Sequence, residues 1–143
     1  MEIQLIKMTI EHTDDVRRLS EQLGYPLSVA QIENNISEII ASENHAAYIA
    51  FCNQKIVGWI HAFRAMLMES QPFIEIGGLI VDQNFRNSGI GKNLVEKIKD
   101  WALENAINEV RVRSNVLTNN AHRFHLNNGF TEMKQQKVFQ ILL

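Results

Sequence analysis

Hydrophobic residues recur with two different periods along the chain, and these periods separate the expected strands from the expected helices. Alternation of apolar and polar residues in Glu2–Lys7 predicts a first strand. A helix follows, with Thr9 or Thr13 as its N-terminal cap. We expect Gly24 and Pro26 to end this helix. Its apolar face carries Val16, Leu19 and Leu23.

A second helix is predicted from a run of isoleucines that follows a capping signal. Ser28, with Gln31 three residues later, is typical of a capping box. The isoleucines at helical spacing are Ile32, Ile36, Ile39 and Ile40. Alternation then returns, so we expect Ala46–Phe51 and Lys55–Phe63 to form a β-hairpin around the turn Cys52–Gln54.

The segment Phe73–Val81 is almost continuously apolar, which is typical of a strand buried on both faces. Gly77 and Gly78 inside it indicate a β-bulge or a place where another group approaches the backbone closely. A helix is predicted next, because apolar residues recur along one stripe at Ile90, Leu94, Ile98 and Trp101.

The last third of the chain predicts three strands and one helix. Glu109–Asn115 alternates as a strand, Thr118–Asn127 forms a short helix, and Phe130–Met133 and Val138–Leu142 form two final strands. The order βααβββαβαββ predicts an α/β fold in which a central mixed sheet is flanked by helices. No repeat or linker interrupts the sequence, so we expect residues 1–143 to form one domain.

Composition excludes several classes of protein. The 143 residues are 45% hydrophobic, which is too much for a disordered chain, and the formal net charge is -2. No basic excess is present to bind nucleic acid or an anionic membrane. Cys52 is the single cysteine, no Cys/His cluster indicates a metal, and no apolar run could span a bilayer. We therefore expect a soluble, cytoplasmic protein without nucleic-acid or membrane partners.

A glycine-rich turn connects the buried strand to the following helix. Gly89 and Gly91 lack side chains, so an anion can reach the backbone N–H groups that the first helical turn leaves unpaired. The helix dipole and the charges of Arg86 and Lys92 add positive potential at the same place. The turn is therefore a candidate site for a phosphate or pyrophosphate.

Two common phosphate-binding motifs do not fit this turn. A P-loop requires glycine where Arg86 stands and serine or threonine where Asn93 stands. A dinucleotide fingerprint requires a third glycine where Leu94 stands. The structural alternative is a plain turn before a surface helix, but the flanking charges and the strand–helix context favour an anion site.

Two motifs resemble the GNAT superfamily of N-acetyltransferases. The run from Arg86 to Gly91 (Arg-Asn-Ser-Gly-Ile-Gly) is similar to the pyrophosphate loop of that family. Ala121–Phe130, which ends in Gly-Phe, is similar to its second signature. The resemblance implies the acyl-CoA N-acyltransferase fold and acetyl-CoA as cosubstrate, with no metal. It does not specify the acceptor.

The resemblance also implies how acetyl-CoA binds. The cofactor would lie across the splayed ends of the strands Ile74–Val81 and Glu109–Asn115. Its pantetheine arm would pair with the backbone of Leu79, Ile80 and Val81. Its pyrophosphate would bind Arg86, Asn87, Ser88, Gly89, Ile90, Gly91 and Lys92. Thr118 stands where the family often has a cofactor-binding asparagine, and the candidate substitutes are Asn119 and Asn120.

Acetyl transfer to an amine requires a base, because an amine of the lysine type has a pKa near ~10.4. Glu75 stands where several family members place a glutamate base. Burial among apolar neighbours would raise the pKa of its carboxyl into a useful range. The alternative is a structural carboxylate that faces solvent or pairs with Arg111 or Arg113.

The leaving thiolate needs a proton or a hydrogen bond. Many family members supply it from a tyrosine at the position of His125. A histidine with a pKa near ~6.5 keeps some imidazolium available for this role. The alternative is that His125 packs in its helix and water donates the proton.

Acceptor selection in this family usually depends on the amino-terminal half, whose acidic residues favour a small cationic amine. A narrower resemblance is to small aminoglycoside 6'-N-acetyltransferases, through compact size, Ser114–Asn115 and His125. A metabolite amine, a protein amino group, and a sensor that binds acetyl-CoA without catalysis remain alternatives. A homodimer is a further expectation, for which the apolar segment Val138–Leu143 provides either interface or core.

Overall fold

The computed structural model describes residues 2–24, 27–114, 116–117 and 119–143. Pro26, Asn115 and Thr118, which enter the predictions above, lie outside this description. The chain divides into two compact units, Met1–Val112 and Arg113–Leu143, and each is described by itself.

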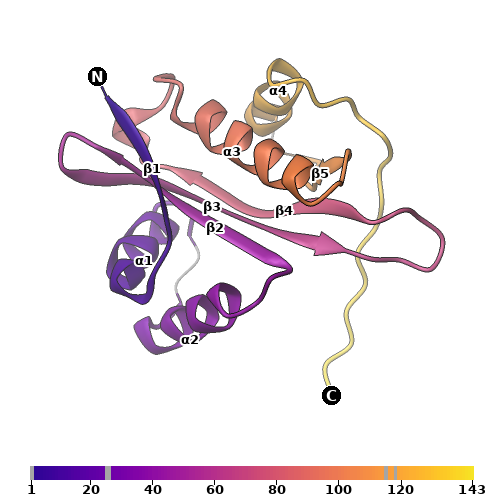
Figure 1. Ribbon diagram of the computed structural model, residues 1–143, viewed down its shortest axis with the longest axis horizontal. Coiled ribbons are helices and arrows are strands. Elements are labelled where there is room, and N and C mark those ends of the chain that lie inside the picture. The colour runs from indigo at the N-terminus through magenta and orange to yellow at the C-terminus, as the bar shows by residue number, and fades with distance from the viewer. Residues whose placement is uncertain (1, 25–26, 115, 118) are drawn as a thin grey trace. The chain divides into compact units, whose positions relative to one another are not determined.

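A five-stranded mixed sheet forms the centre of the first unit (Figure 1). Its strands, in the order in which they neighbour one another, are β1 (Ile3–Lys7), β2 (His45–Cys52), β3 (Lys55–Ala65), β4 (Phe73–Val81) and β5 (Val110–Val112). The first four pair antiparallel, and β5 runs parallel to β4. The predicted fold class, a mixed sheet flanked by helices, is therefore confirmed.

Helices cover both faces of this sheet (Figure 1). The 3₁₀ turn η1 (Ile10–His12) leads into α1 (Thr13–Glu21), which lies with α2 (Val29–Ile40) on one face. The longer helix α3 (Ile90–Glu104) lies on the other. The α1/α2 face buries Met8, Val16, Leu19, Ile32, Ile36, Ala47, Ile49, Ile56 and Ile80. On α3 the predicted stripe is buried at Ile90, Leu94 and Ile98.

The helix caps differ in detail from the prediction. Thr9 caps η1 rather than α1, and His12 returns the capping interaction to its backbone N–H. Ser28 accepts from the backbone N–H of Gln31, but the Gln31 side chain donates to Asn35 instead of completing the box. Leu23 does not share the apolar face, because α1 ends at Glu21 and Leu23 is 46% exposed.

A β-bulge occurs in β4 at the predicted glycine pair. His61 is opposite Gly78 and Ala62 is opposite Ile76, so Gly77 is the extra residue. A Cβ on Gly78 would lie 2.7 Å from the Trp59 ring, and one on Gly77 would lie 2.9 Å from Nδ1 of His61. The groups that approach these glycines are therefore aromatic and imidazole side chains of the neighbouring strand.

The second unit contains the helix α4 (Asn119–Asn127), which is followed by Gly129 at φ +92°. The two strands predicted at Phe130–Met133 and Val138–Leu142 are not formed, and residues 130–143 have no regular secondary structure. A strand is stable only beside another strand, and these residues pair with none of those described. Figure 1 shows the segment as an extended trace after α4. No helix among the described residues is long and apolar enough to cross a membrane.

Candidate active site

The glycine-rich turn joins the end of β4 to the start of α3. Asp82 directly follows β4 and caps the short 3₁₀ turn η2 (Gln83–Phe85). Gly89 is the N-cap of α3 at φ +87°, in the left-handed region that favours glycine, and Asn87 is also left-handed at +63°. The first-turn N–H groups of α3 have no partner within the helix, as in any α-helix.

The surface around Gly89 is open on the side where a side chain would project. A Cβ at this position would have no protein atom within 4 Å. Arg86, Asn87 and Lys92 are exposed nearby, whereas Ile90 and Gly91 are buried in the helix contact with the sheet. The turn thus presents backbone N–H groups, the positive end of a helix and two cations to one open space.

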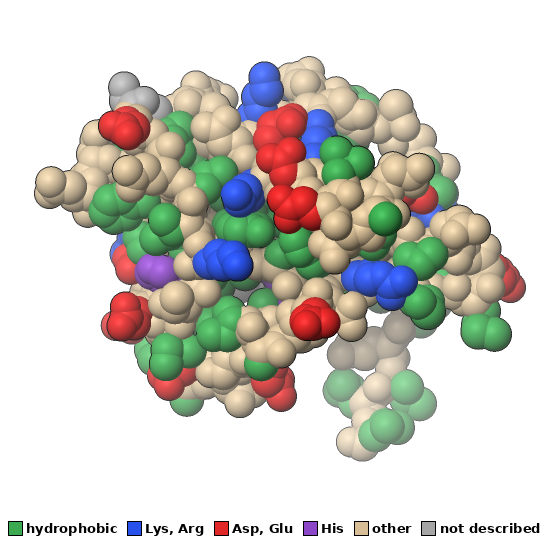
Figure 2. All heavy atoms as spheres, viewed as in Figure 1, with side chains coloured by type: hydrophobic (Ala, Val, Ile, Leu, Met, Phe, Trp, Pro, Cys, Tyr) green, Lys and Arg blue, Asp and Glu red, His purple; other side chains and the backbone are tan. Residues whose placement is uncertain are grey.

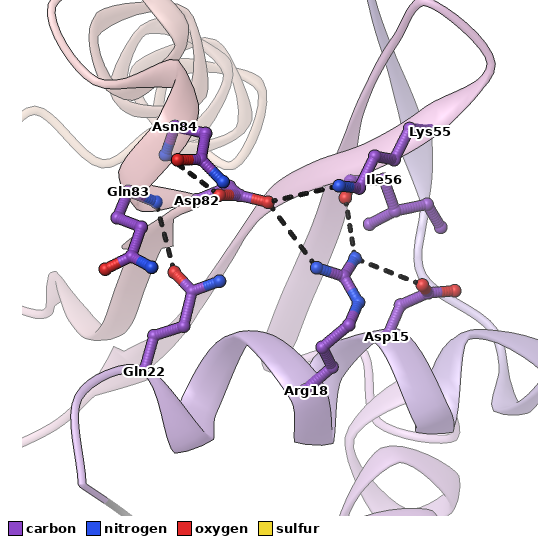
Figure 3. Close-up of polar contacts among 8 residues, drawn as sticks. All are labelled: Asp15, Arg18, Gln22, Lys55, Ile56, Asp82, Gln83 and Asn84. Atoms are coloured by element: carbon purple, nitrogen blue, oxygen red, sulfur yellow. Dashed lines mark hydrogen bonds and ion pairs between the residues drawn. The ribbon is translucent and has the colours of Figure 1, made fainter.

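A buried carboxylate fixes the beginning of this turn (Figure 3). Asp82 is 1% exposed, accepts a hydrogen bond from the backbone N–H of Asn84 at 3.0 Å, and lies 3.8 Å from Nζ of Lys55. Arg18 of α1 approaches the same carboxylate at 3.5 Å. Burial alone would raise the pKa of Asp82, but the Asn84 hydrogen bond and the charges of Lys55 and Arg18 hold it below its usual value.

The open edge of β4 lies next to this turn. β4 pairs with β5 only through Ile74, Glu75 and Ile76, opposite Val110–Val112. From Gly77 to Val81 the described residues pair with β4 only on its other side, where β3 continues to Gly58. The backbone of Leu79, Ile80 and Val81, predicted to bind the cofactor, therefore has no described strand paired with it on the β5 side.

Glu75 belongs to a row of residues that crosses four strands. His45 of β2 is opposite Phe63 of β3, Phe63 is opposite Glu75, and Glu75 is opposite Arg111 of β5. Directly opposite residues point to the same face of a sheet. Trp59 lies four residues before Phe63 on β3, so the two side chains are on the same face of the sheet. Because Trp59 packs against the core under α1 and α2, the row lies on the face that these two helices cover. Glu75 is half-buried.

His45 of this row contacts a second histidine, His61 of β3. Nδ1 of His45 and Nε2 of His61 are 2.9 Å apart, and both rings pack near Phe63. Burial, followed by the charge of His45, lowers the pKa of His61 to about 4, so His61 is neutral at physiological pH. The pair lines a cavity of about 380 Å³ with Asn35, Glu38, Ile39 and Ser42 of the α2 region.

Arg111 has partners that fix its position in the row. Its Nε donates to Glu109 at 2.7 Å, and its guanidinium lies 3.8 Å from the centre of the Phe73 ring. Arg113, the other predicted partner of Glu75, belongs to the second unit and donates to Gln136 there at 3.0 Å.

The remaining predicted residues lie in the second unit. His125 of α4 packs edge-on against Phe124 and Phe130, and its Nδ1 is buried without a hydrogen-bond partner among the described residues. Burial, together with the charge of His122, lowers the pKa of His125 below its usual value. Less imidazolium is therefore present at neutral pH than an unperturbed histidine would supply. Asn120 is exposed in the first turn of α4.

A sequence model of the acetyltransferase (GNAT) family matches residues 11–130, which is most of the chain. The chain belongs to the GNAT acetyltransferase family. It is accordingly an N-acetyltransferase that depends on acetyl-CoA, the cosubstrate of this family. No curated protein sequence matches the chain significantly.

Solved structures show the same fold for this acetyltransferase. The aminoglycoside N-acetyltransferase AAC(6')-Iy, in complex with the bisubstrate analogue CoA-S-monomethyl-acetylneamine, has a TM-score of 0.89 at 19% identity over the whole of both chains. The 6'-N-acetyltransferase AAC(6')-Ih of Acinetobacter baumannii has a TM-score of 0.86 at 18% identity over 99% of each chain. A GNAT acetyltransferase of Staphylococcus aureus has a TM-score of 0.80 at 16% identity, over 99% of this chain and 100% of its own.

A larger hollow of the acetyltransferase has His45 of the row in its lining but no residue of the turn. Its volume is about 770 Å³, and its lining includes Lys7, Tyr48, Lys97, Asp100 and Glu104. Neither Glu75 nor any residue of the glycine-rich turn lines it, so it is not the candidate site. Among the described residues, no three His, Cys, Asp or Glu side chains are grouped to hold a metal ion.

Several residues that the fold brings close to Glu75 or to the glycine-rich turn were not identified as candidates from the sequence. His45, His61 and Phe63 stand at alternating positions of the predicted strands. Such alternation is typical of any half-buried strand, so it does not distinguish residues of a site from ordinary strand residues. Asp82 was visible as the residue after a buried strand, but its partners Arg18 and Lys55 are distant in sequence.

Proposed function

We propose that this enzyme transfers the acetyl group of acetyl-CoA to a primary amine of a small cationic molecule, by direct attack in a ternary complex. The observation that carries the proposal is the unpaired stretch of β4, which has Glu75 before it and the anion-binding turn after it. One extended strand can then align cofactor and base.

The cofactor is proposed to lie along β4. Its pyrophosphate would bind the first-turn N–H groups of α3 together with Arg86 and Lys92. Its pantetheine arm would pair with the backbone of residues 79–81, and Asn120 would contact it from α4. Val81 is six residues after Glu75, which is roughly 20 Å in a strand with a rise of about 3.3 Å per residue. An extended arm can bridge this distance and place the thioester near the bulge.

The reaction is proposed to start with removal of a proton from the acceptor ammonium, by Glu75 directly or through water. The amine nitrogen then attacks the thioester carbonyl, a C–N bond forms, and the C–S bond breaks as the thiolate leaves. An unpaired backbone N–H of β4 would stabilise the negative charge on the carbonyl oxygen. His125 would donate the proton that the thiolate takes up.

The acceptor is proposed to bind on the α1/α2 face beside Glu75. Phe63 and the neutral ring of His61 give this face aromatic surfaces that favour a cation. Glu38 adds a carboxylate to the neighbouring cavity. These groups fit a small amine that carries a positive charge.

The test is release of CoA thiol from acetyl-CoA with a panel of aminoglycosides, polyamines, amino acids and peptides. The solved enzymes of similar fold that are named for aminoglycosides make these compounds the first to examine. We expect amine-dependent release with at least one small polyamine or amino sugar. If only peptides are acetylated, the proposed acceptor class is wrong. If acetyl-CoA binds but no amine gives release, the chain is a binding module instead.

The roles of the two titratable residues are tested separately. We expect Glu75→Gln to lower kcat by about 10²-fold or more, within the range for loss of a general base. Glu96→Gln, on the exposed side of α3, is the matched control. Because the lowered pKa of His125 leaves less imidazolium at neutral pH than an ordinary histidine has, we expect a smaller loss of kcat in His125→Phe. Unchanged kcat in both variants would refute these assignments.

A further inference from the structure

The larger hollow of the acetyltransferase has the dimensions of a ligand site. Its volume is about 770 Å³, and small-molecule sites typically occupy about 300–1,000 Å³. It lies between the second half of α3, the last residues of β1 and α2, and the start of β2. Figure 2 shows basic and acidic side chains around apolar ones on the face of the molecule where α3 lies in Figure 1. The groups that line the hollow therefore indicate what it can bind.

Tyr48 of β2 contributes a hydroxyl group and an aromatic ring to the lining of the hollow. The residue is 8% exposed, and Nζ of Lys97 lies 5.3 Å from the centre of its ring. Burial, followed by the charge of Glu104, raises the pKa of the phenol, so the hydroxyl keeps its proton at neutral pH. This hydroxyl has no hydrogen-bond partner among the described residues. It can therefore donate a hydrogen bond to an anionic group that enters the hollow beside Lys97.

Charged side chains of both signs line the same hollow. The cations are Lys7 and Lys97, and the carboxylates are Glu43, Asp100 and Glu104. In the part of the chain that the structure describes, none of these side chains forms an ion pair within 4.0 Å. Another side of the same helix differs, because Lys99 and Glu96 pair there at 3.0 Å. The charges around the hollow are therefore available to a ligand.

Two of the carboxylates are placed to bind one cation together. Asp100 and Glu104 are four residues apart on α3, so their side chains are neighbours on one face of the helix. Like charges at this spacing destabilise a helix, and an ammonium group between them would remove the repulsion. The hollow thus combines a cation site at Asp100 and Glu104 with an anion site at Lys97 and the Tyr48 hydroxyl.

The spacing of these two sites along α3 indicates the length of the ligand. Position 102, the midpoint of Asp100 and Glu104, is five residues after Lys97, which is roughly 7.5 Å at a rise of about 1.5 Å per residue. An extended dipeptide separates its terminal charges by about the same distance, because each residue spans roughly 3.5 Å. Ile40 and Trp101 also line the hollow and can pack against an apolar side chain of the ligand.

We propose that the larger hollow binds a zwitterion of dipeptide size that carries an apolar side chain. The carboxylate of this ligand contacts Lys97 and the Tyr48 hydroxyl, and its ammonium group lies between Asp100 and Glu104. A molecule with both charges occupies both sites at once, whereas a molecule with one charge leaves the other site unpaired. The proposal does not depend on the acetyl-transfer mechanism, because these four residues lie outside the glycine-rich turn and the row of Glu75.

The first test measures the binding of three related peptides by titration calorimetry in the absence of acetyl-CoA. The probes are alanyl-phenylalanine, its carboxyl-terminal amide, which lacks the carboxylate, and its N-acetyl derivative, which lacks the ammonium group. We expect the unmodified dipeptide to bind and each derivative to bind about ten-fold more weakly, because one charge-assisted contact is lost. The measurement requires no catalysis, so its result stands whether or not the chain acetylates an amine.

The second test locates the site through variants that remove one charge preference at a time. In Lys97→Gln we expect the dipeptide and its amide to bind equally, because the carboxylate has lost its cation. In Asp100→Asn combined with Glu104→Gln, we expect the dipeptide and its N-acetyl derivative to bind equally. Lys99→Gln and Glu96→Gln are the matched controls, because they remove charges of the same kind from α3 outside the hollow, and both preferences should persist.

Three results would overturn the proposal. The first is a dipeptide that does not bind at millimolar concentration. The second is an amide or an N-acetyl derivative that binds as tightly as the unmodified dipeptide, because the hollow would then recognise one charge alone. The third is an unchanged preference for the carboxylate in the folded Lys97→Gln variant, which would place the peptide elsewhere, such as beside Glu75. The peptide series on the unmodified protein remains decisive if a variant fails to fold.

Discussion

The guanidinium of Arg18 lies 3.5 Å from the carboxylate of Asp82, and it connects the first helix to the start of the glycine-rich turn. Arg18 also donates to the backbone carbonyl of Ile56 at 2.9 Å and contacts Asp15 at 3.3 Å (Figure 3). The turn is thus held from the α1/α2 face of the sheet, although its own helix, α3, lies on the opposite face. Cofactor binding should therefore depend on a contact that a sequence motif does not include.

Replacement of Asp82 tests this connection. In Asp82→Asn, Arg18 and Lys55 lose their buried counter-charge, but both are partly exposed and can be solvated. We expect the free energy of unfolding to fall by about 2 kcal/mol and the affinity for CoA to fall with it. Urea unfolding and titration calorimetry measure the two effects. Asp15→Asn, which removes only an exposed contact of Arg18, should change neither by a comparable amount.

Gly89 is expected to matter for cofactor binding more than for stability. Gly89→Val places a branched side chain in the open space before α3, where the pyrophosphate is proposed to bind, and forces a left-handed backbone on it. We expect CoA affinity to fall at least ten-fold in calorimetry, while stability falls by about 1–2 kcal/mol. Gly24→Val is the matched control, because Gly24 has a similar φ of +79° and an equally open Cβ position. Equal CoA affinity in both variants would refute the assignment of the turn.

Gly78 permits the close packing of Trp59 on β4. A methyl group at this position would overlap the indole ring, which packs against the α1/α2 core and cannot move freely. We expect Gly78→Ala to lower the free energy of unfolding by about 1–3 kcal/mol, as overpacking usually does. Trp59→Leu in the same background should recover part of this loss, measured by urea unfolding. An additive loss in the double variant would mean that the two residues do not clash.

His61 should make the stability depend on pH. Its pKa is about 4 in the folded protein against 6.5 for the ordinary side chain, so the unfolded chain binds more protons between these values. The contribution of His61 to the free energy of unfolding is fully present above pH 6.5, falls as the pH is lowered, and is lost below about pH 4. We expect it to be about 2 kcal/mol after a discount for partial solvent exposure. His61→Gln should flatten this part of the curve, and a curve of unchanged slope would contradict the assignment.

The elements of the first unit could be predicted from the sequence because their signals are local. The period of the hydrophobic residues distinguished the strands β2–β4 from the helices. The glycines at positions 77–78 indicated a bulge, and those at positions 89 and 91 indicated an anion-binding turn. These features depend on residues within a few positions of one another. The prediction that Leu23 lies on the apolar face of the first helix was wrong for a local reason too. A periodic pattern does not indicate at which turn a helix ends.

The candidate site could be predicted only in part, because its geometry depends on register. Glu75 was identified, but its neighbours His45 and Phe63 follow from cross-strand pairing that the sequence does not specify. The bulge at Gly77 moves the register of β3 by one residue, which also brings His61 beside Gly78. The two final strands were predicted from alternation alone, and alternation does not reveal which strand they pair with.

The spacing of the two functional regions on β4 has a consequence for how such an enzyme can acquire new substrates. Glu75 and its row lie near one end of the strand, and the turn anchored by Asp82 follows the other end. Changes at positions 45, 61 and 63 can therefore reshape the acceptor side without altering the cofactor anchor. A population of variants could explore different amines while each retains the same acetyl donor, and divergence of selectivity would then require few substitutions.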